Sequence, residues 1–258
     1  MLNPWRTVLL IAVAVCGLSV CSFAQNPANW SYGAFNGPAR WAALFPVSCA
    51  KPTGQSPISI PAHLSPTALP HIKFQYQSAH FLVENINYAT EVLATNSAEN
   101  RIIWNNVAYN LVQIHFHFPA EHQIAGVTSP VTEAHFVHKD GKGNLLVIAV
   151  LAINGGANGT VTSIWNNLPP SYGGHGEVSI NPLGLLPGNG SGADNLGYYT
   201  YQGSLTVPLC DQPVTWLVLK RQMDISQAQL DKAKCNTYPN ARPLQNQTPS
   251  PVIKESDF

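Results

Sequence analysis

Short runs of alternating or β-branched residues, separated by turn-forming residues, recur along most of the sequence. Such runs predict β-strands, because successive side chains of a strand point to opposite faces. The 21 prolines and 19 glycines interrupt the chain too often for many long helices. We therefore predict a mainly β (α+β) protein. The strands are expected at residues 72–77, 81–83, 89–94, 113–118, 134–138, 145–153 and 214–219.

Two other segments carry different signals. Residues 169–192 hold seven glycines and four prolines, which predicts long surface loops. Residues 225–234 are the best candidate for a helix, with Ser226 or Asp224 as its N-cap. No internal repeat, charge block or strong interior linker divides the chain, so we expect a single domain.

The N-terminus has the pattern of a secretory signal peptide. Arg6 precedes an uncharged run at residues 7–20, and Ser22 and Ala24 are small residues at the positions that a signal peptidase reads. We predict a signal at residues 1–24 and a mature domain at 25–258, secreted or periplasmic. A lipoprotein signal ending at Cys21 is the alternative. The run is shorter than the roughly 20 residues that span a bilayer, so no membrane span is expected.

The charge balance limits the class of partner. Lys plus Arg and Asp plus Glu number 13 each, and the isoelectric point is near 7.1. A chain without a net positive field is not expected to bind nucleic acid. Removal of the signal leaves Cys49, Cys210 and Cys235 in a compartment where disulfides persist. Spacing alone allows any of the three pairings.

Most of the chemically informative residues lie at residues 113–122 and 133–138. On a strand, Gln113, His115 and His117 share one face, and Glu133 and His135 repeat the pattern. If the two strands pair, three imidazoles converge, which is the ligand set of a catalytic zinc site. Gln113 and Glu133 are suited to orient the ring nitrogens that do not bind metal. An isolated His-x-His is more often structural, but the third histidine and the polar partners favour metal.

Two further readings concern the same region. His122 follows a Pro-Ala break and His138 falls on the face opposite the other imidazoles, so both are predicted to be structural. The spacing from His115 to Glu121 also fits a cupin metal motif, in which Glu121 is a fourth ligand for iron or manganese. Cupins expect glycine where Tyr109 stands, which weakens that alternative.

These motifs, with others in the same order, resemble the α-class carbonic anhydrases over about residues 30–244. The resemblance implies a central, mostly antiparallel twisted sheet of about ten strands, few short helices and long surface loops. It also implies a zinc enzyme that reversibly hydrates carbon dioxide to bicarbonate and a proton, a carbonate dehydratase. The further motifs that carry it are Trp30-Ser-Tyr32, Gly54-Gln-Ser-Pro-Ile58, Tyr201-Gln-Gly-Ser-Leu-Thr206, Val214-Thr-Trp216 and Asn240-Ala-Arg-Pro243.

The resemblance assigns a role to each matching residue. Zinc would be held by His115, His117 and His135, with Asn240 as an outer partner beside Gln113 and Glu133. Thr206 would accept a hydrogen bond from zinc-bound hydroxide and donate its own proton to Glu121. Val207 stands where many members carry a second threonine. The apolar wall that receives carbon dioxide would comprise Val137, Val147, Leu205, Val207, Val214 and Trp216.

The resemblance also points to a departure from the family. Tyr88 occupies the position of the histidine that shuttles protons in many fast members, and tyrosine, with a pKa near 10, is a poor relay at pH 7. Proton transfer is therefore expected to limit turnover, unless His63, His71 or His80 reaches the cavity mouth.

Three remaining expectations follow from the same resemblance. It pairs Cys49 with Cys210 and leaves Cys235 without a counterpart. It allows a monomer or a homodimer. Because some members of the family have lost zinc ligands and serve in recognition, a non-catalytic binding module is a further alternative.

Overall fold

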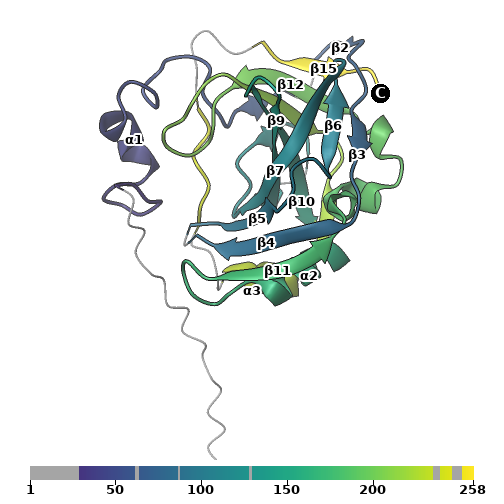
Figure 1. The fold of residues 1–258 in the computed structure, drawn as a ribbon. Helices are drawn as coiled ribbons and strands as arrows, with labels where there is room; N and C mark the ends of the chain where they lie inside the picture. The colour runs from purple at the N-terminus through teal and green to yellow at the C-terminus, as the bar shows by residue number, and fades with distance from the viewer. Residues whose placement is uncertain (1–28, 62–63, 87, 128–129, 235–238, 246–251) are drawn as a thin grey trace, which may run out of the picture.

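The structure is a computed structural model of the 258-residue chain, and it describes residues 29–61, 64–86, 88–127, 130–234, 239–245 and 252–258. A large twisted sheet occupies the centre, and short helices lie at its periphery (Figure 1). The predicted signal segment lies outside the described residues, and so do His63 and Cys235. Within the described ranges, no helix is long and apolar enough to cross a membrane.

The described elements are mostly strands. The strands are β1 (Ser59–Ile60), β2 (Pro66–Thr67), β3 (Lys73–Gln75), β4 (Ala79–Asn85), β5 (Thr90–Ala94), β6 (Arg101–Trp104), β7 (Val107–His117), β8 (Gln123–Ile124), β9 (Thr132–Asp140), β10 (Leu145–Asn154), β11 (His175–Ile180), β12 (Tyr198–Gly203), β13 (Val214–Leu219), β14 (Met223–Ile225) and β15 (Lys254–Ser256). The α-helices are α1 (Pro38–Leu44), α2 (Gly159–Asn167) and α3 (Gln227–Lys234). Three short 3₁₀ helices follow β11, at Pro182–Leu185, Pro187–Gly190 and Ala193–Asn195.

The main sheet is mostly antiparallel, as expected, but it includes parallel pairings and has more strands than the ten or so that were expected. Its 13 described strands follow the order β11-β4-β5-β7-β9-β10-β13-β12-β15-β2, with β3, β6 and β14 attached beside this path. Strand β10 pairs in parallel with β13 and β14, and β15 pairs in parallel with β2. Parallel neighbours need a long crossover connection, and α2, β11 and β12 lie between β10 and β13 in the chain. Several of the additional strands have only two or three residues, too few to show a period in the sequence.

The two faces of the central strands carry different side chains. Ile114 and Phe116 of β7 and Phe136 of β9 face the main core, where Trp165 of α2 packs 4.9 Å from the Phe116 ring. A register shift between Leu111 and Gln113 lets both Leu111 and Ile114 reach that core. The opposite face of β7 is left for polar side chains, which is the face where the histidines lie.

The sequence predictions for individual elements were confirmed in part. Each of the seven expected strands overlaps a strand of the sheet, and the expected helix at 225–234 is α3. The Ser226 hydroxyl accepts a hydrogen bond from the backbone N–H of Gln229 at 3.3 Å, so Ser226 rather than Asp224 acts at its N-terminus.

The prediction of loops at residues 169–192 was wrong for residues 175–180. Residues His175–Ile180 form β11, which pairs with β4 along its whole length. Gly176 is needed within this strand, because a Cβ there would lie 2.0 Å from the backbone oxygen of Asn167. A glycine that reads as a strand breaker in the sequence therefore permits close packing in the fold.

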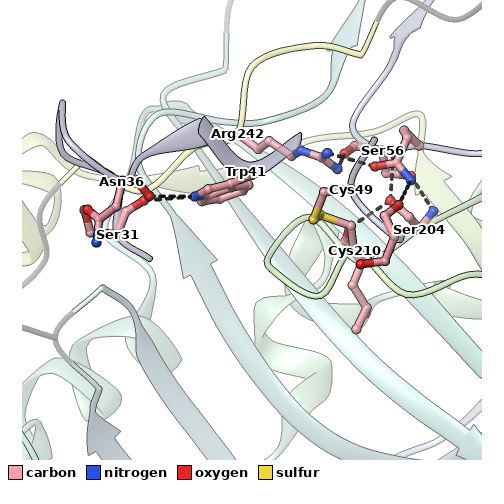
Figure 2. The surroundings of a disulfide bond; sticks show 11 residues. Ser31, Asn36, Trp41, Cys49, Ser56, Ser204, Cys210 and Arg242 are labelled. Atoms are coloured by element: carbon pink, nitrogen blue, oxygen red, sulfur yellow. Dashed lines mark hydrogen bonds between the residues drawn. A yellow bond between two sulfur atoms is a disulfide. The ribbon is translucent and has the colours of Figure 1, made fainter. Parts of the chain in front are cut away.

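A cluster of buried residues separate from the main core lies at α1. It contains the disulfide between Cys49 and Cys210, which is the pairing that the resemblance implied. Trp41 of α1 packs in the same cluster, and the Arg242 guanidinium lies 5.8 Å from its ring centroid (Figure 2). Ser56 and Ser204 bond to each other through their hydroxyls and backbone N–H groups, at 3.0 and 3.1 Å. These links hold the loop that connects β12 to β13.

Candidate metal centre

Strands β7 and β9 bring three histidines together. His115 and His117 lie two residues apart on β7, so they share a face, and His135 of β9 is the direct partner of His115 across the pair. Nε2 of His115 and Nδ1 of His135 are 3.2 Å apart. One ring nitrogen from each of the three residues lies within 4.8 Å of the others. The predicted convergence of three imidazoles is therefore present.

Each ring is oriented by an oxygen on its outer side. Nδ1 of His115 lies 2.7 Å from Oε1 of Gln113, and Nδ1 of His117 lies 2.8 Å from the carbonyl oxygen of Asn240. Nε2 of His135 lies 2.7 Å from Oε1 of Glu133. Because these oxygens accept hydrogen bonds, the outer nitrogens carry the protons, and the lone pairs of the inner nitrogens point toward one another.

The inner nitrogens are best explained as ligands of a metal ion. Nε2 of His117 is buried and has no hydrogen-bond partner among the described residues. A buried polar atom without a partner is costly, and a metal ion would satisfy it. Three neutral imidazoles with no fourth protein ligand match a tetrahedral zinc site with one open position.

The buried Glu133 carboxylate holds the outer layer of the site. Its Oε2 accepts hydrogen bonds from the backbone N–H groups of Glu121 and His122, at 2.8 and 2.7 Å. Its Oε1 lies 2.6 Å from Nδ1 of His122, whose Nε2 is 2.7 Å from the Tyr201 hydroxyl. Burial alone would raise the pKa of Glu133, but His122 and His135 hold it well below its usual range. Both ring nitrogens of His122 are thus engaged, which supports its predicted structural role.

A second group of potential ligands overlaps the first. Nitrogen and oxygen atoms of His122, Glu133 and His135 also lie close enough together to hold an ion. These atoms already form the hydrogen bonds that orient His122 and His135. The set His115, His117 and His135 is therefore the better candidate.

Glu121 lies behind the ligand rings. Its Oε1 accepts a hydrogen bond from the Arg242 backbone N–H at 2.7 Å and lies 3.4 Å from Nδ1 of His117, the outer nitrogen. A fourth ligand would face the inner nitrogens instead, so this placement argues against the cupin alternative. Burial and then the charge of Glu133 raise the pKa of Glu121, while Arg242 and the Thr206 hydroxyl act in the opposite direction. Among the described residues, Oε2 of Glu121 has no hydrogen-bond partner, so the hydrogen bond from Thr206 to Glu121 stays a prediction.

Apolar side chains line up beside His135. The Trp216 ring lies 4.8 Å from the His135 ring. Five of the six predicted wall residues belong to the same hydrophobic cluster. Val207 packs instead in the cluster around the disulfide, together with Tyr88. The five are Val137, Val147, Leu205, Val214 and Trp216.

Comparison with known proteins identifies the family. Residues 36–249 match the sequence profile described as eukaryotic-type carbonic anhydrase. A carbonic anhydrase of Neisseria gonorrhoeae is 38% identical over 245 residues, which cover 92% of this chain and 91% of that protein. The chain belongs to the carbonic anhydrase family.

Solved structures place it in the α class. The α-carbonic anhydrase of Photobacterium profundum superposes with a TM-score of 0.77 at 32% identity, covering 87% of this chain and 99% of that one. The α-carbonic anhydrase of Thermovibrio ammonificans, solved with the inhibitor sulfanilamide, gives 0.79 at 31% identity, covering 89% and 99%. The fold and the family therefore agree with the resemblance read from the sequence.

Tyr88 is packed into an aromatic cluster. Its ring lies 4.6 Å from that of Trp30 and 6.3 Å from that of Tyr32. Burial raises the pKa of Tyr88 to about 12. A phenol with so high a pKa does not exchange protons readily at pH 7, so the structure adds to the reason for expecting slow transfer at this position.

Two of the histidines named as possible substitutes, His71 and His80, make contacts elsewhere. His71 stacks on Phe258 and its Nδ1 lies 2.9 Å from the Asp194 carbonyl oxygen. Nδ1 of His80 lies 3.1 Å from the Ser179 hydroxyl. On β4 it is Glu84, four residues after His80, that is in register with His115 through Glu91. Neither observation connects them with the site.

Glu91 is a polar residue of the carbonic anhydrase site that the sequence analysis missed. It lies opposite His115 in the register of β5 and β7, and its Oε1 accepts a hydrogen bond from Nε2 of Gln113 at 3.3 Å. Burial, with a smaller contribution from Glu84, raises the pKa of Glu91 to about 7. The alternation in residues 89–94 already placed Glu91 on the face opposite Val92, but only the register shows that this face meets the histidines.

The buried histidines predict an unusual pH dependence of metal binding. Burial lowers the pKa of His115, His117 and His135, that of His117 to about 3. A lowered pKa means that protons compete with metal only at more acidic pH. Three exposed imidazoles would weaken zinc binding by about 10³-fold between pH 8 and pH 5.5. We expect less than a roughly tenfold loss here, measured by chelator competition. A loss near 10³-fold would contradict this.

Proposed function

We propose that this protein catalyses the reversible hydration of carbon dioxide with zinc bound by His115, His117 and His135. Membership of the carbonic anhydrase family and the α-carbonic anhydrase fold support carbonate dehydratase activity. The observation that carries the proposal is the inward aim of three ring nitrogens whose outer nitrogens are held by Gln113, Asn240 and Glu133. Retention of the complete triad argues against a non-catalytic binding module.

The residues around the three histidines would have different roles in the reaction. When bound, zinc would lower the pKa of a water molecule from 15.7 to about 7, which supplies a nucleophile at neutral pH. With zinc bound, Thr206 would accept a hydrogen bond from this nucleophile and donate its own hydroxyl hydrogen to Glu121, and this pair would orient the nucleophile toward the substrate. The apolar wall beside His135 receives carbon dioxide, an uncharged molecule that needs a dry surface rather than hydrogen bonds. Gln113, Glu133 and Asn240 keep the rings in position.

The cellular site follows from the predicted signal at residues 1–24. We propose export to a periplasmic or extracellular space. The Cys49–Cys210 disulfide supports this, because such bonds persist in oxidising compartments. The partner is then a small molecule, carbon dioxide or bicarbonate, for a monomer or homodimer.

Turnover should be limited by proton release. We expect kcat to rise severalfold with added imidazole buffer, because an external base replaces the histidine that Tyr88 displaces. Tyr88→His should raise kcat in dilute buffer and leave kcat/KM unchanged, measured by stopped flow. Val107→His, at an exposed position at the far end of β7, is the matched control. A kcat that does not respond to buffer, or to Tyr88→His, would show that proton release does not limit this enzyme.

A further inference from the structure

Polar side chains form a row across four neighbouring strands. In the register of the sheet, His175 of β11 lies opposite Glu84 of β4, Glu84 opposite Glu91 of β5, and Glu91 opposite His115 of β7. Residues directly opposite each other in an antiparallel pair point to the same face. The four side chains are therefore in line on the face of the sheet that carries the metal ligands. Three strand spacings separate the ends of the row, about 14 Å.

The row begins in the site and ends in solvent. Gln113, which orients His115 through its oxygen, donates a hydrogen bond from Nε2 to Glu91. Glu84 is half-buried beside it, and His175 is exposed on β11, the strand at one end of the sheet. The row thus runs from the hydrogen-bonded surroundings of His115 to the exposed His175 on the edge strand β11.

The groups around Glu84 are suited to proton exchange. Glu91 faces it from β5 and His175 from β11. Tyr88 and Tyr172 lie in the adjoining loops. Glu91 and Tyr172 both act electrostatically on Tyr88. An exposed imidazole is the side chain whose ordinary pKa lies between pH 5 and 8, which suits it to deliver protons to solvent.

The geometry points to Glu84 and His175 as the outer part of an internal proton exit, slower than the route that a histidine at position 88 would provide. This inference rests on the proposed function and concerns the same site. The proton released in each hydration passes through water to the Glu84 carboxylate, which becomes a carboxylic acid. It then passes to the His175 imidazole, which becomes an imidazolium ion and gives the proton to water or buffer. Only O–H and N–H bonds form and break, and no electrons are transferred.

A matched control lies on the same strand and face. Glu177 is exposed and two residues from His175, but its row continues through Leu82 and Leu93 before it reaches Gln113. Two apolar side chains interrupt that row. Glu177→Gln therefore removes the same charge as Glu84→Gln from the same region without breaking the proposed path.

The test compares the zinc-loaded wild type with Glu84→Gln, His175→Gln and Glu177→Gln. In dilute bulky buffer, we expect Glu84→Gln and His175→Gln to lower kcat roughly tenfold, with kcat/KM unchanged and kcat restored by imidazole. Glu177→Gln should leave both constants unchanged. The proton-dependent release of water in ¹⁸O exchange should fall in parallel with kcat.

A readout independent of activity checks the contact itself. The NMR chemical shift of the His175 imidazole, recorded at one pH, should change in Glu84→Gln, because the two side chains face each other across β11 and β4. Glu177→Gln should change it less.

The possible failures are distinguishable. Normal hydration with kcat unchanged in Glu84→Gln and His175→Gln would overturn the exit route and leave the proposed function standing. A parallel fall of kcat and kcat/KM, with loss of zinc, would show a structural role and also overturn it. An unchanged chemical shift of His175 in Glu84→Gln would show that the two side chains are not in contact, and would overturn the route. No hydration by the wild type would remove the proposed function and the route together.

Discussion

His117→Ala should abolish stable zinc binding and reduce carbon dioxide hydration to the uncatalysed background. His117 supplies one of the three inward nitrogens, and its Nε2 has no hydrogen-bond partner among the described residues. Loss of an outer partner of a metal ligand costs about 10- to 100-fold in metal affinity, and loss of the ligand itself should cost more. Metal content after dialysis and stopped-flow hydration measure the two effects.

Two comparison variants make this result specific. Gln113→Ala removes only the oxygen that orients His115, so we expect a loss within about 10- to 100-fold. His80→Ala changes an exposed histidine and should retain full metal content and activity. If His117→Ala kept zinc as tightly as Gln113→Ala, the assigned ligand set would be incorrect.

The double variant Cys49→Ser/Cys210→Ser should be strongly destabilised. The bridge joins residues 161 positions apart, and a loop of that length restricts the unfolded chain greatly. We expect the free energy of unfolding to fall by about 2–5 kcal/mol and the Tm by roughly 5–20 °C. Urea denaturation and calorimetry, with both proteins zinc-loaded, give these values.

The same variant should also affect the reaction, but less than loss of a ligand. The backbone N–H of Cys210 donates to the Val207 carbonyl oxygen at 2.7 Å, so the bridge helps to hold the loop that carries Thr206. Treatment of the wild type with a reducing agent should reproduce the destabilisation. A Tm within about 1–2 °C of the wild type would show that the aromatic cluster alone holds this region.

The core of the site could be predicted because it depends on a local period. In residues 113–117 and 133–137, alternate side chains must share a face, whichever strands lie beside them. The disulfide pairing could not be predicted from a local period. Its two cysteines are far apart in the chain, so only the family resemblance selected Cys49 and Cys210.

The features that were missed depend on which strands become neighbours. Residues His175–Ile180 read as loop, because Gly176 and the surrounding glycines and prolines weaken a local strand signal. Pairing with β4 overrides that signal. Likewise, Glu84, Glu91 and His175 are ordinary polar residues in the sequence. Only the register of β11, β4, β5 and β7 puts them in line with His115.

Stopped-flow hydration of carbon dioxide by the zinc-loaded mature protein tests the central claim most directly. The metal-free protein and zinc-loaded His80→Ala serve as the blank and the matched control. The account predicts rapid hydration that requires zinc, that His80→Ala retains, and whose kcat rises with imidazole. Hydration no faster than the metal-free blank, from folded protein with one zinc ion bound, would contradict it.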